Sequence, residues 1–157
     1  MCEYCGCQAL TSIAALTSEH DALAAMIGEA RAAATRADPD ASAAVARRIV
    51  AVLGPHTRVE EDGLFPALAG EYPEHVAGLQ AEHRRIEAIL AEAVGGTPAD
   101  PAWPARLLDA MRLLREHILK EQDGVFPAAL ISLSADDWDR VEQVRAKVSA
   151  AESAEMR

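Results

Sequence analysis

The chain has 157 residues, of which 50% are hydrophobic and 4% aromatic, and its formal net charge is −10 at pH 7. This length suits one compact domain with its own core. The acidity and the absence of a Lys/Arg cluster exclude a typical nucleic-acid binder and disfavour an anionic membrane surface. No apolar run reaches the roughly 18–20 residues that span a bilayer. From the charge and from the apolar runs together, we expect neither nucleic acid nor membrane as a partner.

The chain opens with a segment, residues 1–9, that contains Cys2, Cys5 and Cys7. It lacks the basic and apolar regions of a secretory signal, which predicts a cytoplasmic location. An odd number of closely spaced cysteines does not indicate a disulfide framework. A plain tail, a redox switch and a second metal site remain open for this cysteine-containing tail.

Apolar residues then recur at helical spacing in four long stretches, which predicts helices over about residues 10–36, 42–68, 73–94 and 103–130. Turn-forming segments separate them, such as Asp38-Pro39-Asp40. Gly54-Pro55 falls inside the second helix and predicts a kink there. Short connectors favour an all-α fold, an antiparallel up-down-up-down four-helix bundle over residues 10–131.

A further helix begins near Ser134, where Ser134-Ala135-Asp136-Asp137 resembles a capping box. We therefore assign residues 132–157 to an additional C-terminal helix packed on the bundle. Trp138 is its expected anchor.

The chain contains an internal repeat. Residues 56–67 read HTRVEEDGLFPA and residues 117–128 read HILKEQDGVFPA, while Ser18-Glu19-His20-Asp21 echoes Ala81-Glu82-His83-Arg84. Each half therefore carries one His on its first helix and a His-x-x-x-Glu on its second. A duplicated hairpin alone would explain the shared Gly, Phe and Pro as setting a bend, but not the shared His and Glu.

Six residues of this repeat form a candidate metal site. A His and a Glu four residues apart lie on one helix face, about 6 Å apart along the axis. Imidazole and carboxylate together suit Fe, Mn, Zn or Co. A core-facing Glu also needs a partner, which a cation supplies. The predicted metal ligands are His20, His56, Glu60, His83, His117 and Glu121.

Other polar residues near the repeat are weaker candidates. His75 has no repeat counterpart and is expected on the surface. Glu87 follows His83 by four residues but has no counterpart after His20, so a ligand role is the less favoured reading. Glu61 and Gln122 are expected to be exposed or to lie beside the ligands. Asp62 and Asp123 could orient a ligand histidine, but capping the bend before the glycine is the favoured reading.

The ordered pattern of His, His-x-x-x-Glu, His and His-x-x-x-Glu resembles the haemerythrin-like family, the HHE cation-binding domains. The likeness covers roughly residues 10–131 and includes Gly63-Leu64-Phe65-Pro66 with its repeat copy. It implies a bundle with two non-haem iron ions. His20 and His56 would serve one iron, His83 and His117 the other, and the two glutamates would bridge them. Ligand type alone leaves Mn or Zn open.

Members of this family carry O₂, sense oxygen or iron, or react with peroxide or nitric oxide. The resemblance therefore predicts a protein that binds or senses O₂, NO or peroxide. Oxygen-carrying members have another His one turn before the third-helix His, where this chain has Leu79. Unless Glu87, water or another residue fills it, the resulting open metal position favours redox chemistry over reversible carriage. A metal-dependent enzyme acting on peroxide or nitric oxide, and a signalling module with a structural metal, stay as alternatives.

Overall fold

The computed structural model describes residues 6–157, and this part of the chain is helical with no strand. The all-α prediction is therefore confirmed for these residues. The helices in chain order are α1 (Cys7–Thr35), α2 (Pro39–Val59), the π-helix η1 (Glu60–Leu64), α3 (Phe65–Leu68), α4 (Pro73–Ala91), α5 (Trp103–Lys120), the π-helix η2 (Glu121–Val125), α6 (Phe126–Ser132) and α7 (Ala135–Glu155).

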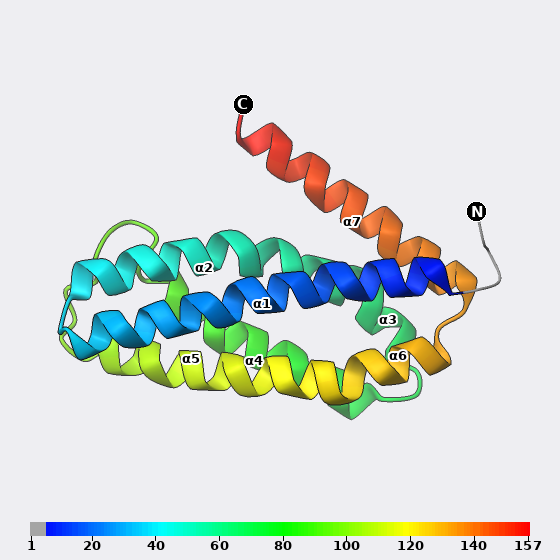
Figure 1. Ribbon diagram of the computed structural model, residues 1–157, viewed down its shortest axis with the longest axis horizontal. Coiled ribbons are helices and arrows are strands. Elements are labelled where there is room, and N and C mark those ends of the chain that lie inside the picture. Colours follow the sequence, from blue (N-terminus) through cyan, green and yellow to red (C-terminus); the bar gives the residue numbers. More distant parts are fainter. Residues whose placement is uncertain (1–5) are drawn as a thin grey trace.

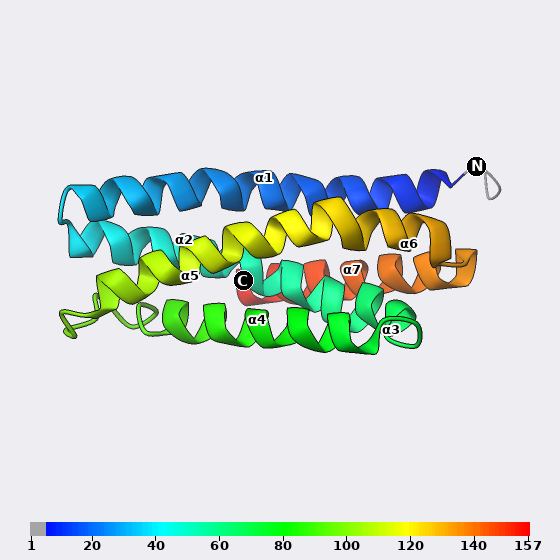
Figure 2. The same cartoon turned by 90° about the horizontal axis from the view of Figure 1, so that it is seen from below.

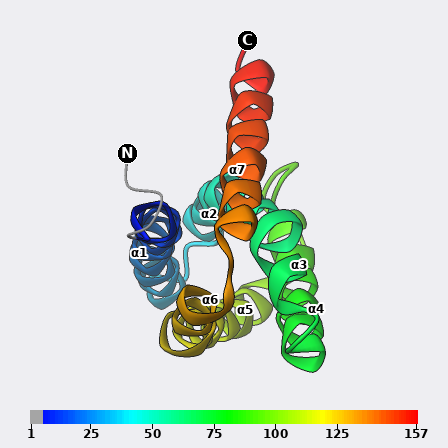
Figure 3. The same cartoon turned by 90° about the vertical axis from the view of Figure 1, so that its right-hand side faces the viewer.

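Four long helical stretches lie side by side: α1, α2–η1–α3, α4 and α5–η2–α6 (Figure 1, Figure 2). The end-on view shows α1, α2, α4 and α5 arranged around a common interior (Figure 3). In Figure 1, α1 runs leftwards from its first residue and α2 returns to the right. Within residues 6–157, no helix is long and apolar enough to cross a membrane.

Local sequence explains where two of the helices begin. The Asp38 carboxylate accepts a hydrogen bond from the backbone N–H of Ala41, and Pro39 follows at the first helical position of α2. At α7, Ser134 and Asp137 form the predicted capping box. The helix α1 begins at Cys7, within the stretch that we assigned to the tail.

Both copies of the repeat form a π-helix where a continuous α-helix was predicted. The backbone N–H of Phe65 bonds to the carbonyl of Glu60, and that of Phe126 to Glu121, five residues back in each case. The next residue in both copies is a proline, which has no N–H to continue the α-helical ladder. By contrast, α2 runs through Pro55 and ends at Val59. The π-helix η1 therefore lies just before Pro66, whereas Pro55 lies inside α2 without a change of helix type.

Two apolar clusters fill the bundle interior, one toward each end. Along α1, Leu16 belongs to one cluster and Leu23 to the other, with His20 between them. The same order holds along α4, where His83 lies between Leu79 and Ile86. The polar residues of the repeat therefore lie in the middle of the bundle, closed off at both ends by apolar side chains.

The helix α7 packs on the outside of the bundle and then leaves it. Trp138, Val141 and Val148 are buried and belong to the apolar cluster that includes Leu16. The burial of Trp138 matches its expected role as an anchor. The C-terminal end of α7 projects away from the other helices (Figure 1, Figure 3).

Candidate metal centre

The six predicted ligands meet in the bundle interior, where none is more than 1% exposed. They come from six elements: His20 from α1, His56 from α2, Glu60 from η1, His83 from α4, His117 from α5 and Glu121 from η2. Residues from all four long stretches thus converge on one place.

Two groups of four residues have the geometry of a metal site. In each group, one ligand atom per residue lies within 4.8 Å of the others. The first group is His20, His56, Glu60 and Glu121, and the second is Glu60, His83, His117 and Glu121. Both glutamates belong to both groups, so the two candidate cation positions would share both carboxylates.

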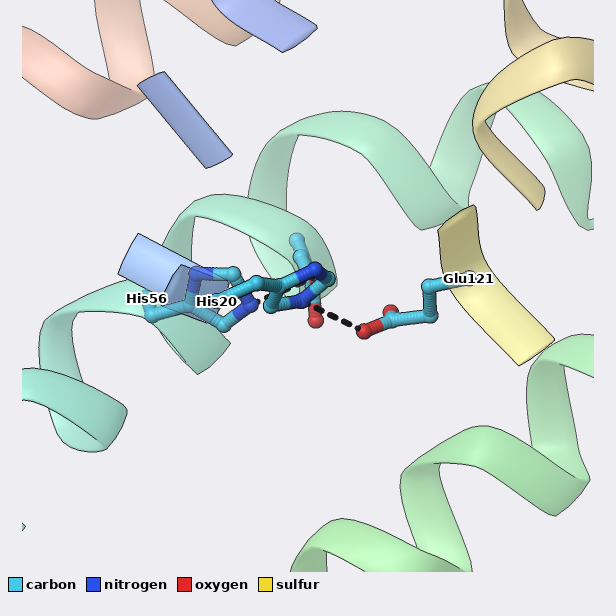
Figure 4. A group of neighbouring side chains, drawn as sticks. His20, His56 and Glu121 are labelled. Atoms are coloured by element: carbon cyan, nitrogen blue, oxygen red, sulfur yellow. Dashed lines mark hydrogen bonds and ion pairs between the residues drawn. The ribbon is translucent and has the colours of Figure 1, made fainter. Parts of the chain in front are cut away.

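Each shared glutamate faces one histidine of each group. Glu121 Oε1 lies 3.1 Å from His20 Nε2 and 3.2 Å from His117 Nε2. Glu60 lies 2.9 Å from His56 Nε2 through Oε1 and 3.3 Å from His83 Nε2 through Oε2. Figure 4 shows His20 and His56 next to each other, with the carboxylate of Glu121 pointing toward them.

The outward-facing nitrogen of every histidine in the centre has its own partner. In the first group, His20 Nδ1 lies 3.2 Å from the side-chain oxygen of Gln122, and His56 Nδ1 lies 3.0 Å from a Glu19 oxygen. In the second group, His83 Nδ1 lies 2.8 Å from Glu61, and His117 Nδ1 lies 2.8 Å from Glu82. An oxygen beside Nδ1 favours a proton on that nitrogen. The Nε2 lone pairs then face the interior, as metal ligation requires.

Several interior atoms lack a hydrogen bond, which tests whether a cation fits. Glu60 lies at ion-pair distance from His56 and His83, and His117 at ion-pair distance from Glu121, but these contacts lack hydrogen-bond geometry. Both Glu60 carboxylate oxygens, Glu121 Oε2, and the Nε2 atoms of His83 and His117 are thus buried without a hydrogen bond. Buried polar atoms are normally paired, and an unpaired one is costly. Five convergent lone-pair atoms of imidazole and carboxylate are a donor set that suits a divalent cation such as Fe, Mn or Zn.

Two histidines of the centre, His56 and His117, have raised pKa values. Burial disfavours a charged His56, but the carboxylates of Glu60 and Glu19 outweigh it and raise the pKa of His56 to about 10. Burial is likewise outweighed at His117, where Glu121 raises the pKa to about 9. The pKa of Glu60 lies well below its usual value, since its histidine contacts overcome its burial. Metal binding therefore competes with protons on the histidines.

The phenylalanine of each repeat copy stacks on a histidine of the other half. Phe126 lies on His20, with ring centroids 5.3 Å apart and planes 11° apart. Phe65 lies on His83, with centroids 5.9 Å apart and planes 8° apart. The shared Phe therefore limits the orientation of a ligand ring, a role that the sequence reading did not assign to it.

The weaker candidates lie outside both groups. His75 is exposed, as expected, and Glu87 pairs with Arg84 at 2.8 Å. Asp62 and Asp123 are exposed, and the Nδ1 atoms of the four ligand histidines are paired with other residues.

Two further features of the sequence bear on the centre without belonging to it. Leu79 is 6% exposed and packs in the apolar cluster that includes Leu16. Cys7 is exposed at the start of α1, whereas Cys2 and Cys5, and with them the predicted roles of the cysteine cluster, lie outside the described residues.

Sequence reasoning did not assign roles to three supporting charges: Glu19, Glu82 and Arg145. The repeat could have indicated Glu19 and Glu82, because each directly precedes the first histidine of its copy. Arg145 binds Glu19 through both terminal nitrogens, at 3.1 and 3.0 Å. It has no counterpart in the repeat, so no sequence pattern indicated its role.

An all-helical domain with a buried histidine and glutamate cluster of this kind is suited to binding metal cations. The chain matches the hemerythrin HHE cation-binding domain over residues 11–129 and belongs to this family. The resemblance predicted from the sequence is thereby confirmed. Searches of curated proteins and of solved structures gave no match.

Proposed function

We propose that this chain is a di-iron protein with an antiparallel up-down-up-down bundle, which binds or senses O₂, NO or peroxide. The single observation that carries the proposal is that Glu60 and Glu121 each belong to both four-residue groups. Two carboxylates shared in this way suit two adjacent cations. The donor chemistry fits Fe, Mn or Zn, and the family resemblance favours iron.

The chain's own residues would define how the centre works. His20 and His56 would hold one ion, His83 and His117 the other, and the two glutamates would bridge them. Bound iron would supply redox chemistry and a coordination position for a small ligand. The carboxylates of Glu19, Glu61 and Glu82 hold histidine rings in place, which raises ligand basicity.

The experiment that tests this function is rapid mixing of the reduced, iron-loaded protein with O₂, NO or peroxide, followed by visible absorption. The wild type should give a distinct absorption change with at least one of the three. His56→Ala should lose the response together with its metal. His75→Ala is the matched control, because His75 is exposed and outside both groups, and it should behave as the wild type. Identical behaviour of the two variants would contradict the assignment.

A second candidate function is catalytic turnover of peroxide or nitric oxide. Leu79, an apolar side chain one turn before His83, favours it, because it leaves the second metal short of one protein ligand. Leu79 also lines a cavity of about 680 Å³ between α4 and η2. Steady consumption of peroxide or NO that ceases on metal removal supports this candidate. A stable, reversible complex without turnover supports binding or sensing instead.

A third candidate is a signalling module whose metal is structural. Loss of helicity on chelation without any reaction toward the three small ligands would favour it.

A further inference from the structure

The helix α7 lies beyond the family match, which ends at residue 129, yet it reaches the support of the metal centre. Arg145 of α7 donates to both oxygens of the Glu19 carboxylate, at 3.1 and 3.0 Å. Glu19 in turn accepts from His56 Nδ1 at 3.0 Å. A guanidinium fork on a carboxylate fixes orientation as well as charge. A chain of two contacts thus connects α7 to a predicted ligand.

The helix α7 also packs against η1, the π-helix that carries Glu60. A Cβ on Gly63 of η1 would lie 3.2 Å from the Cα of Val141 and 3.5 Å from the Cβ of Val144. The absence of a side chain at Gly63 therefore allows the two helices to approach closely. Gly124, the counterpart in η2, has no neighbouring atom within 4 Å of such a Cβ. One π-helix is covered by α7 and the other is not.

The second half of the repeat is supported from within the bundle. Glu82 is the counterpart of Glu19 and accepts from His117 Nδ1 at 2.8 Å. Its cation is Lys120, a residue of α5 itself. Because of this difference, the group that contains His117 keeps its support without α7.

We propose that α7 sets the metal affinity of one position, the one formed by His20 and His56, with Arg145 as a positioning residue. This rests on the proposed two-metal function. Arg145 holds the Glu19 carboxylate, which orients the His56 ring so that Nε2 faces the centre. The far end of α7 projects from the bundle (Figure 3). The loss of the Arg145 contact therefore acts on the position of His20 and His56, because Glu19 meets His56 and no histidine of the other pair.

The test is a titration of the metal-free full chain with Co²⁺, followed by visible absorption, with bound metal counted by elemental analysis. The wild type should take up two equivalents. Arg145→Met should weaken one of them by on the order of tenfold, the lower end of the range for partners of metal-ligating histidines. Lys120→Met is the matched variant and should weaken the other equivalent. Lys147→Met removes an exposed charge from α7 and should leave both unchanged.

Two single-position backgrounds assign the affected site. In a His83→Ala background, Arg145→Met should weaken the remaining equivalent, whereas in a His20→Ala background it should not. Combining Arg145→Met with Glu19→Gln should add nothing to Glu19→Gln alone, because the arginine acts through that carboxylate. Arg145→Lys keeps the charge and should recover part of the affinity.

The outcomes separate the two proposals. Fewer than two equivalents on the wild type would contradict the two-metal function itself. Two equivalents on the wild type, with Arg145→Met indistinguishable from Lys147→Met, would overturn the role of α7 alone, as would additive losses in the double variant. If circular dichroism shows Arg145→Met to be unfolded, the affinities of Arg145→Lys and Glu19→Gln for the two metal equivalents are measured instead. Both variants should weaken one equivalent, and no loss in either would overturn the role of α7.

Discussion

Removing the metal should markedly destabilise this protein, and the structure sets the scale of the effect. Five buried atoms of the centre have no hydrogen-bond partner within the chain. An unsatisfied buried polar atom costs at least about 1 kcal/mol, so a cation that satisfies all five should contribute on the order of 5 kcal/mol. For a domain of this size, 1 kcal/mol corresponds to roughly 2–4 °C in Tm. Chelation should therefore lower Tm by about 10–20 °C.

The assay is thermal unfolding followed by circular dichroism, before and after removal of metal with a chelator, with elemental analysis to confirm the removal. Re-addition of the metal should restore Tm. Glu121→Ala is the control, because a variant that has lost the centre should not respond to the chelator. An unchanged Tm for metal-free wild type would refute the reasoning, since the buried lone pairs would then be satisfied without a cation.

Three other predictions address separate parts of the molecule. Trp138→Ala should lower the free energy of unfolding by about 3–5 kcal/mol in urea denaturation, since Trp138 is 4% exposed and anchors α7. Glu82→Gln should weaken one metal equivalent by about 10–100-fold in a metal titration, because the carboxylate of Glu82 accepts from His117 Nδ1. Leu79→His places an imidazole on the same helix face as His83. It should change the visible spectrum of the iron-loaded protein and slow any peroxide turnover.

Each of these has an outcome that counts against it. A Trp138→Ala variant within about 0.5 kcal/mol of the wild type, the range of ordinary surface changes, would mean that α7 is not held by that side chain. Equal loss of both metal equivalents in Glu82→Gln would contradict the separation of the two positions. An unaltered spectrum in Leu79→His would show that residue 79 does not reach the second metal.

Helix extents could be predicted from sequence because apolar periodicity is a local property. The last residue predicted for the second stretch, Leu68, is also where α3 ends. The π-helices could not be predicted in the same way. Their five-residue hydrogen bonds join a buried Glu to a buried Phe, and this burial depends on the surrounding helices.

The candidate ligands could be predicted because the repeat presents them twice in the same order. Their partners are harder to predict, since which carboxylate meets which Nδ1 depends on how neighbouring helices are rotated. His20, for example, meets Gln122, which lies 102 residues away along the chain. Arg145 lies 126 residues from Glu19 along the chain and outside the repeat, so only the folded structure brings this contact to light.

The most direct test of the central claim is the metal content of the freshly purified protein, measured by elemental analysis after iron-replete expression. We predict about two irons per chain, and loss of both from a variant in which Glu60 and Glu121 are replaced together by Ala. One zinc per chain, or no metal, would contradict a two-metal centre built on the shared glutamates.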